Sequence, residues 1–268
     1  MKFEETQVFN FKGAFRGMRN PLASWKKSDS AFGVGDYNEN EAAFDNIATE
    51  YCEANGVNSL EDDYDEAFDS IQNWLYDNGI GLMVYGEHCE EYALLGPKDM
   101  DLATRLIKAG PEHRKFLRQI FVSVDITAPL YWWKEMDTYK LGTVANSTST
   151  MHKLASTPIT MDCFETDDMD IQNLAIDDGE ANIRHELELT INFLEQLRLK
   201  YNETKDKRYW KELVRWLPNG WLQTRTWTAN YEVLRNIYHQ RKDHKLTEWH
   251  QFCRWIESLP YAKQLIID

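Results

Sequence analysis

The sequence predicts an α+β protein in which helices surround a modest, mainly antiparallel sheet. The stretch from Gln119 to Ile126 alternates apolar and polar side chains, which is the period of a half-buried strand. Several later stretches place apolar residues every three or four positions, which is the period of an amphipathic helix. The 268 residues contain no fixed-period repeat and no low-complexity tract, so we expect a single domain over residues 1–268.

The elements of the first half follow from local signals. Carboxylates from Glu61 to Glu66 open a helix that runs through Leu75, because acidic side chains in a first turn stabilise the helix dipole. In the strand that starts at Gln119, the even-numbered residues 120–126 are apolar and form one face. Pro129 suits the first turn of the next helix, expected from Pro129 to Lys140.

The second half opens with an acidic excursion from Asp162 to Glu180, which lacks the residue spacing of a calcium loop. A long amphipathic helix from Asn182 to about Lys200 has one apolar stripe to bury, in its own chain or against another subunit. A turn at Pro218 to Gly220 precedes a strand from Trp221 to Trp227. Two further helical stripes follow: Tyr231, Leu234, Ile237 and Tyr238, then Leu246, Trp249, Phe252, Cys253 and Ile256.

Composition restricts the class of protein. The 30 basic and 44 acidic side chains give a formal charge of −14, which opposes binding of duplex DNA or RNA but leaves room for a small anion in a local basic pocket. No run approaches the roughly 18 apolar residues of a membrane span, and we expect a cytosolic protein. The four cysteines form no Cys-x-x-Cys pair, so reduced thiols and no zinc site are expected.

The stretch from Asp101 to Lys153 resembles the core of the flavin-dependent thymidylate synthases, which methylate dUMP with FAD, NADPH and methylenetetrahydrofolate. Tyr139-Lys140-Leu141, seven residues and then Ser149 keep the frame of that family's Arg-His-Arg, seven residues, Ser signature. Trp227-Thr-Ala-Asn230 and the later Arg241 are similar to its Thr-Gly-Asn-Leu-Arg helix. Ala14 to Arg19 stands where the family has its first helix, and Asp101 to Gly110 stands where it has the helix before the strand. The resemblance implies that fold, a homotetramer with pockets lined by several chains, and FAD as a possible cofactor.

The chain departs from the family at the residues that the resemblance assigns to ligands. Tyr139 and Leu141 replace two arginines that contact the flavin, and Met151 replaces the arginine that helps hold the dUMP phosphate. Gln119 occupies the position of a flavin-contacting histidine of the family, and Glu232 occupies the position where a phosphate-binding arginine is expected. Because guanidinium groups supply the bidentate donors that suit phosphate, we expect no thymidylate synthesis.

Three segments carry candidate ligand-binding residues. Lys140, Ser149, His152 and Lys153 accompany a run of hydroxyl side chains that suits a small polar or phosphorylated ligand; alternatively, Ser149 caps a helix and the others are surface residues. No catalytic residue is assigned.

Arg16 and Arg19 begin the second segment, a loop that continues through Trp25, Lys26 and Lys27, and Arg with Trp suits a planar anion. Its alternative is a charged loop with Trp25 packed on the core.

The third segment holds Asn230, Arg235 and Arg241, with Arg225 and His239 nearby in sequence. Arg235 and His239 share a helix face by their spacing of four.

We therefore expect a protein that binds a nucleotide or a nucleotide-derived small molecule on a thymidylate synthase-like scaffold without making dTMP. The alternative is a flavoenzyme that acts on a uridine nucleotide, retains Ser149, Asn230 and Arg241, and binds FAD. A second alternative is a structural or protein-interaction scaffold whose acidic surface recruits a basic partner.

Overall fold

The computed structural model describes residues 1–35, 37–57, 59, 63–79, 83–85, 89–167 and 183–268. The chain forms two compact units. The first unit comprises Met1–Glu4, Asp125–Lys140 and Ala145–Trp227, and the second comprises Glu5–Val124, Leu141–Val144 and Thr228–Asp268. A single domain over 1–268 stays a prediction.

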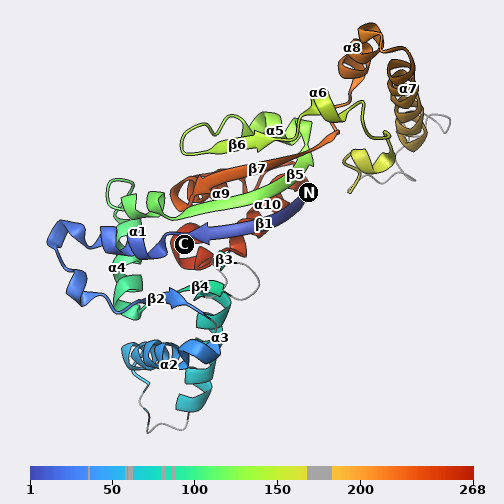
Figure 1. The fold of residues 1–268 in the computed structure, drawn as a ribbon. Coiled ribbons are helices and arrows are strands. Elements are labelled where there is room, and N and C mark those ends of the chain that lie inside the picture. The colour runs from blue at the N-terminus through green and yellow to red at the C-terminus, as the bar shows by residue number, and fades with distance from the viewer. Residues whose placement is uncertain (36, 58, 60–62, 80–82, 86–88, 168–182) are drawn as a thin grey trace. The chain divides into compact units, whose positions relative to one another are not determined.

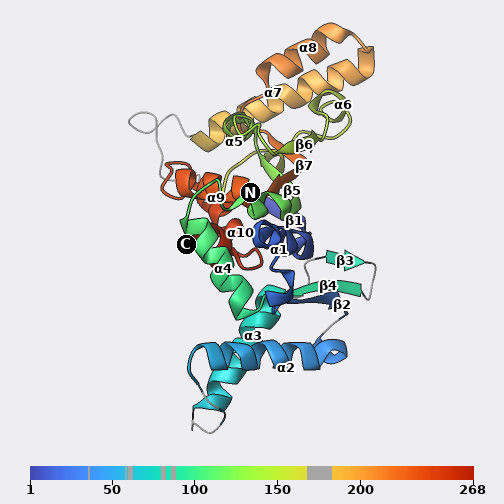
Figure 2. The same cartoon turned by 90° about the vertical axis from the view of Figure 1, so that its left-hand side faces the viewer.

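Helices and short strands are interspersed along the described chain, with helices in the majority (Figures 1 and 2). The strands are β1 (Lys2–Phe9), β2 (Ala31–Val34), β3 (Met83–Tyr85), β4 (Cys89–Leu94), β5 (Phe121–Pro129), β6 (Val144–Ser147) and β7 (Leu222–Asn230). The α-helices are α1 (Phe11–Met18), α2 (Tyr37–Ala54), α3 (Tyr64–Gly79), α4 (Pro97–Lys108), α5 (Leu130–Met136), α6 (Thr150–Lys153), α7 (Ile183–Thr204), α8 (Lys207–Trp216), α9 (Tyr231–Arg241) and α10 (Thr247–Glu257). Short single-turn elements are η1 (Asn20–Leu22), η2 (Trp25–Lys27), η3 (Lys115–Gln119), η4 (Met161–Cys163) and η5 (Lys263–Ile267).

The strands form two small sheets. One has four strands in the order β1-β5-β7-β6, and the other has three in the order β2-β4-β3. In the three-stranded sheet both pairs are antiparallel, with Ala31 opposite Leu94 and Met83 opposite Glu91. Two small sheets among many helices confirm the predicted α+β class.

The predicted strand is confirmed with shifted bounds, and the predicted helix after it is shorter than expected. Residues 120, 122, 124 and 126 are fully buried, as the alternation indicated. The expected helix from Pro129 to Lys140 ends instead at Met136, because Thr138 and Tyr139 donate their N–H groups to carbonyls only three residues back. Tyr139 and Lys140 therefore follow the turn that ends the helix, and Pro129 precedes the helix rather than starting it.

The amphipathic helices of the C-terminal half are confirmed. All four stripe residues of α9 are buried, and so are Trp249, Phe252, Cys253 and Ile256 on α10. In the first unit, the stripe of α7 packs inside its own chain, where Ile191 and Leu194 join a buried cluster with Leu213 of α8. Figures 1 and 2 both show α7 and α8 lying side by side as a hairpin.

In the second unit, α2 and α3 pack on the three-stranded sheet. Phe44 of α2, Leu75 of α3 and Leu94 of β4 are fully buried in one apolar cluster. The helix expected from Glu61 begins at Tyr64, with Asp65 and Glu66 in its first turn. Glu61 and Asp62 lie outside the described residues, as does most of the acidic excursion, from residue 168 to its end at Glu180.

Candidate functional site

Most polar side chains singled out in the signature-like segment and the residues after it lie at the surface. Lys140 is exposed and Tyr139 is half-buried. Ser149 begins α6 as its N-cap, its side chain accepts a hydrogen bond from the His152 backbone N–H, and Ser149 Oγ lies 2.8 Å from His152 Nδ1. His152 and Lys153 are exposed, so the alternative of a helix cap with surface residues describes their geometry.

Arg225 of β7 lies in the same unit and is already held by neighbouring side chains. Its guanidinium stacks 4.2 Å above the Trp133 ring and donates to Asp137 Oδ1 at 2.7 Å. Its Nε also donates to Gln223 Oε1 at 3.0 Å. These contacts cover one face of the guanidinium and engage two of its nitrogens, so Arg225 has a packing role in the first unit.

In the second unit, the α9 residues that resemble the family helix are held by structural contacts. Asn230 caps α9, its Oδ1 accepting from the Val233 N–H at 3.0 Å. The Glu232 side chain is 8% exposed, and both of its oxygens accept from Arg114 Nε, at 3.2 and 2.9 Å. Arg241 stacks 4.6 Å above the Trp249 ring.

Arg235 and His239 lie near the Glu232–Arg114 ion pair. Arg235 donates to the carbonyl of Ile266 at 2.6 Å. Burial lowers the pKa of Arg235, and the positive charge of Arg114 lowers it further. Burial also lowers the pKa of His239, and Arg235 adds to that effect. This corner of the unit therefore favours the neutral form of the imidazole.

The loop after α1 projects a tryptophan rather than burying it. Trp25 is 41% exposed, so the alternative in which it packs on the core is wrong. The Arg16 guanidinium lies 5.1 Å from its ring centroid, and its Nε1 donates to Asn20 Oδ1 at 2.8 Å. These partners hold the ring at the surface because both belong to the same short stretch of chain.

The same loop is anchored by a buried ion pair. Arg19 is 5% exposed, and its Nε donates to Asp99 Oδ1 at 2.5 Å. Asp99 is fully buried, and its other oxygen accepts from the hydroxyls of Ser28 and Ser30 at 2.5 and 2.7 Å. Asp29 adds a cap on α4, since its carboxylate accepts from the backbone N–H groups of residues 98 and 99 at 2.7 and 3.0 Å.

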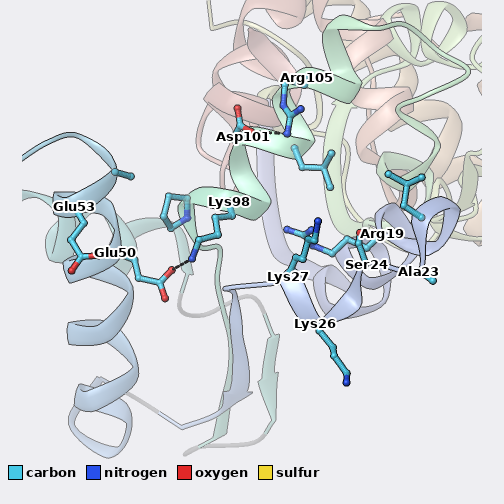
Figure 3. Close-up of a pocket in the computed structure, with 14 residues that line it drawn as sticks. Arg19, Ala23, Ser24, Lys26, Lys27, Glu50, Glu53, Lys98, Asp101 and Arg105 are labelled. Atoms are coloured by element: carbon cyan, nitrogen blue, oxygen red, sulfur yellow. Dashed lines mark hydrogen bonds and ion pairs between the residues drawn. The ribbon is translucent and has the colours of Figure 1, made fainter.

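The anchored loop forms one wall of an open groove of about 970 Å³ within the second unit (Figure 3). The C-terminal end of α2 and the exposed side of α4 form the other walls. Leu22, Ala23, Ser24, Lys26 and Lys27 come from the loop; Glu50, Glu53 and Ala54 from α2; Pro97, Lys98, Asp101, Leu102 and Arg105 from α4; Arg19 completes the lining. The volume suits a ligand of nucleotide size.

Several charged side chains of the groove pair with one another. Lys98 Nζ reaches from α4 to Glu50 Oε2 at 3.5 Å, and Arg105 pairs with Asp101 on the same helix at 2.8 Å. Figure 3 marks both contacts. For the exposed Lys26 and Lys27 no ion pair is found within the described part of the chain. The loop wall thus presents two cations that are available to an anion.

The structure brings only part of the predicted site together. Arg19 lines the groove, whereas Arg16 is not among the lining residues and stacks on Trp25. Lys140, Ser149, His152 and Lys153 belong to the first unit, whereas Asn230, Arg235 and Arg241 belong to the α9 region of the second. As ligand-binding residues, all nine stay predictions.

Sequence reasoning missed the walls that α2 and α4 contribute. No local signal marks Glu50, Glu53, Lys98 or Arg105, because each belongs to an ordinary helix surface. The basic pair Lys26-Lys27 beside Trp25 in an acidic chain was the one available signal.

Among the described residues, no group of three or more His, Cys, Asp or Glu side chains is placed to hold a metal ion. Cys52, Cys163 and Cys253 are free thiols. No helix within the described ranges is long and apolar enough to cross a membrane.

Comparison with solved structures identifies the fold. Thymidylate synthase X (ThyX) from Helicobacter pylori, solved with FAD and dUMP, is 14% identical and aligns over 99% of this chain and 97% of its own with a TM-score of 0.56. A second structure of flavin-dependent thymidylate synthase ThyX from Helicobacter pylori, complexed with FAD and dUMP, is 17% identical, with 64% of this chain and 83% of that chain covered and a TM-score of 0.47. No protein-family model matches this chain, and no match to a curated protein was found. The chain has the fold of the flavin-dependent thymidylate synthases, as its sequence resemblance implied.

Proposed function

We propose that this protein binds a nucleotide or a nucleotide-derived small molecule on a thymidylate synthase-like scaffold and does not make dTMP. The absence of dTMP synthesis is proposed from the buried Glu232 carboxylate, held by Arg114 at 2.9 Å, where the resemblance expects a phosphate-binding arginine. A buried negative charge at that place repels a phosphate, and Arg114 is already engaged in neutralising it.

The donor set at the signature positions also fits a flavin poorly. Leu141 is 89% exposed and offers no hydrogen bond, and Tyr139 offers one hydroxyl in place of a guanidinium fork. Lys140 is the remaining cation of the triplet, and a lysine binds phosphate as a point charge without bidentate geometry. Each charged hydrogen bond that is lost weakens binding by about 1.5–3 kcal/mol. The residues at these positions therefore do not fit FAD.

The groove of the second unit supports binding of an anionic small molecule. Lys26 and Lys27 supply two cations on a loop that the Arg19–Asp99 pair anchors. Leu22 and Leu102 supply apolar surface for a base or sugar. A pocket that joins apolar surface to a few charged groups is the common form of a small-molecule site.

The first-unit residues Lys140, Ser149, His152 and Lys153 stay part of the proposal as a second place for phosphate contact, since three of them are exposed. A homo-oligomer, tetrameric by resemblance, also stays a proposal, and light scattering of the purified protein tests it.

The test begins with the visible spectrum of the purified protein, followed by titration with FAD and, separately, with dUMP in a calorimeter. We expect no flavin absorbance, no quenching of added FAD, measurable heat with dUMP, and no dUMP-dependent oxidation of NADPH. Bound FAD together with NADPH oxidation would overturn the proposal in favour of a flavoenzyme. Absence of binding to any nucleotide would favour the scaffold alternative.

The residues are tested with two variants and a control. Lys26→Ala with Lys27→Ala removes the loop cations, and Lys140→Ala removes the signature cation. Lys12→Ala, an exposed lysine of α1, is the control for a general loss of positive charge. The variant that weakens dUMP binding identifies the segment that holds the phosphate.

A further inference from the structure

The groove of the second unit has opposite charges on its two sides. Figure 3 shows Glu50 and Glu53 projecting from α2 on one side, and Lys26 and Lys27 from the loop on the other. A ligand with a single phosphate uses only the loop side. The Glu50 and Glu53 carboxylates would then make no favourable contact with such a ligand.

The pairing pattern shows which charges the protein leaves for a ligand. Arg19 is neutralised by Asp99, and Arg105 by Asp101, so these residues contribute no net charge to the groove. Beyond them, Lys26 and Lys27 on the loop and Glu53 on α2 have no ion pair within the described residues. The charges that remain are therefore positive on one side and negative on the other.

Glu50 adds to the negative side because its own counter-charge is weak. Its partner Lys98 lies at 3.5 Å and is shared with Asp29 at 3.9 Å. Burial raises the pKa of Glu50; Lys98 lowers it by less, and the charge of Asp29 raises it again. A cation beside Glu50 and Glu53 would relieve both carboxylates.

The surface between the two sides is largely apolar. Ala54, Pro97 and Leu102 line it, with Leu22 at 85% exposure beside them. Such surface suits the uncharged middle of a ligand whose ends carry the charges.

We propose that the groove takes a zwitterionic nucleotide, with its phosphate against Lys26 and Lys27 and a protonated amine, carried on the base or on a tail, against Glu50 and Glu53. This inference rests on the proposed function and narrows its ligand class. The amine is recognised by two carboxylates, and a plain nucleotide satisfies only half of the site.

The test uses three probes that share one phosphate: dUMP, 5-aminoallyl-dUMP, and N-acetylated 5-aminoallyl-dUMP. The acetyl group removes the positive charge while keeping the tail, so it separates charge from added contact area. We expect 5-aminoallyl-dUMP to bind about tenfold more tightly than the other two in calorimetric titration, since one well-placed charged contact has about that effect.

The variants assign the preference to the carboxylates. In the double variant Glu50→Gln, Glu53→Gln, we expect dUMP and 5-aminoallyl-dUMP to bind with equal affinity. Glu41→Gln, an exposed carboxylate on the same helix α2 but outside the groove lining, should keep the preference. Thermal melting of each variant confirms that it is folded.

The outcomes separate the two proposals. If none of the probes binds, the proposed nucleotide-binding function is wrong. If all three bind with equal affinity, or if the double Gln variant keeps the preference for the amine, the function stands and the zwitterion inference is overturned.

Discussion

Replacement of Asp99 by Asn is the sharpest stability test that the second unit offers. Asp99 is fully buried and accepts hydrogen bonds from Arg19, Ser28 and Ser30. The amide keeps the shape of the carboxylate but removes its charge. Arg19, at 5% exposure, would then be a buried cation without a counter-charge.

The expected loss is large because the partner stays buried. Removing one member of a buried ion pair costs about 3–5 kcal/mol of folding free energy. The matched control is Asp101→Asn on the same helix, whose partner Arg105 is 67% exposed at its side chain. An exposed pair four residues apart in a helix contributes about 0.3–0.5 kcal/mol. The two substitutions therefore differ roughly tenfold in expected effect for the same change of atoms.

Urea unfolding followed by far-ultraviolet circular dichroism measures both effects, with the m-value as a check that the transition stays comparable. Replacing both partners, Arg19→Met with Asp99→Leu, should recover much of the stability because no buried charge then remains. A loss below about 1 kcal/mol for Asp99→Asn would refute the reasoning, since that is the range of solvent-exposed pairs.

Three further outcomes are expected. Glu232→Gln should destabilise the chain by about 2–3 kcal/mol in the same urea assay, because it leaves the half-buried Arg114 without its carboxylate; a change within error would mean that water already solvates Arg114. The lowered pKa of His239 means that the unfolded chain takes up the proton first as the pH falls through the ordinary value of 6.5. The stability contributed by neutral His239 is therefore present above that pH and is lost as the solution becomes more acidic. His239→Gln should reduce the fall in melting temperature between about pH 7.5 and about pH 5.5. A fall as large as that of the unchanged protein would contradict this prediction. Leu213→Ala in the buried α7–α8 cluster should cost about 2–5 kcal/mol, against about 0.5 kcal/mol for the neighbouring Val214→Ala at 37% exposure, and similar losses at both positions would contradict the packing described.

The elements that sequence analysis located correctly are those with a strong internal period. The alternation from residue 120 to residue 126 and the apolar stripes of α9 and α10 can each be recognised within a single element, because the buried side chains recur at the period of the backbone. Boundaries were less predictable. The helix after Pro129 ends early because Thr138 and Tyr139 form turn hydrogen bonds instead of helical ones. The spacing of apolar residues does not indicate which of these hydrogen bonds will form.

The candidate site was predictable only where its chemistry is local. Ser149 as a helix cap was an explicit alternative, and the structure shows that cap geometry. Burial of Trp25 was the alternative for its segment, since tryptophans are usually buried, but its partners Arg16 of α1 and Asn20 of the following loop hold the ring at the surface. The exposure of a single aromatic residue depends on neighbours that composition does not specify.

The sequence by itself determined the α+β class, the buried strand and the amphipathic helices, because each of these follows from the pattern of neighbouring residues. Only the tertiary structure decided that Arg19 pairs with Asp99, eighty positions along the chain, and that Lys26, Glu53 and Arg105 line one groove. Such pairings depend on how three separate segments pack in the second unit. Periodicity fixes which face of a helix is buried, but it does not fix which charged residue of another segment lies across from it.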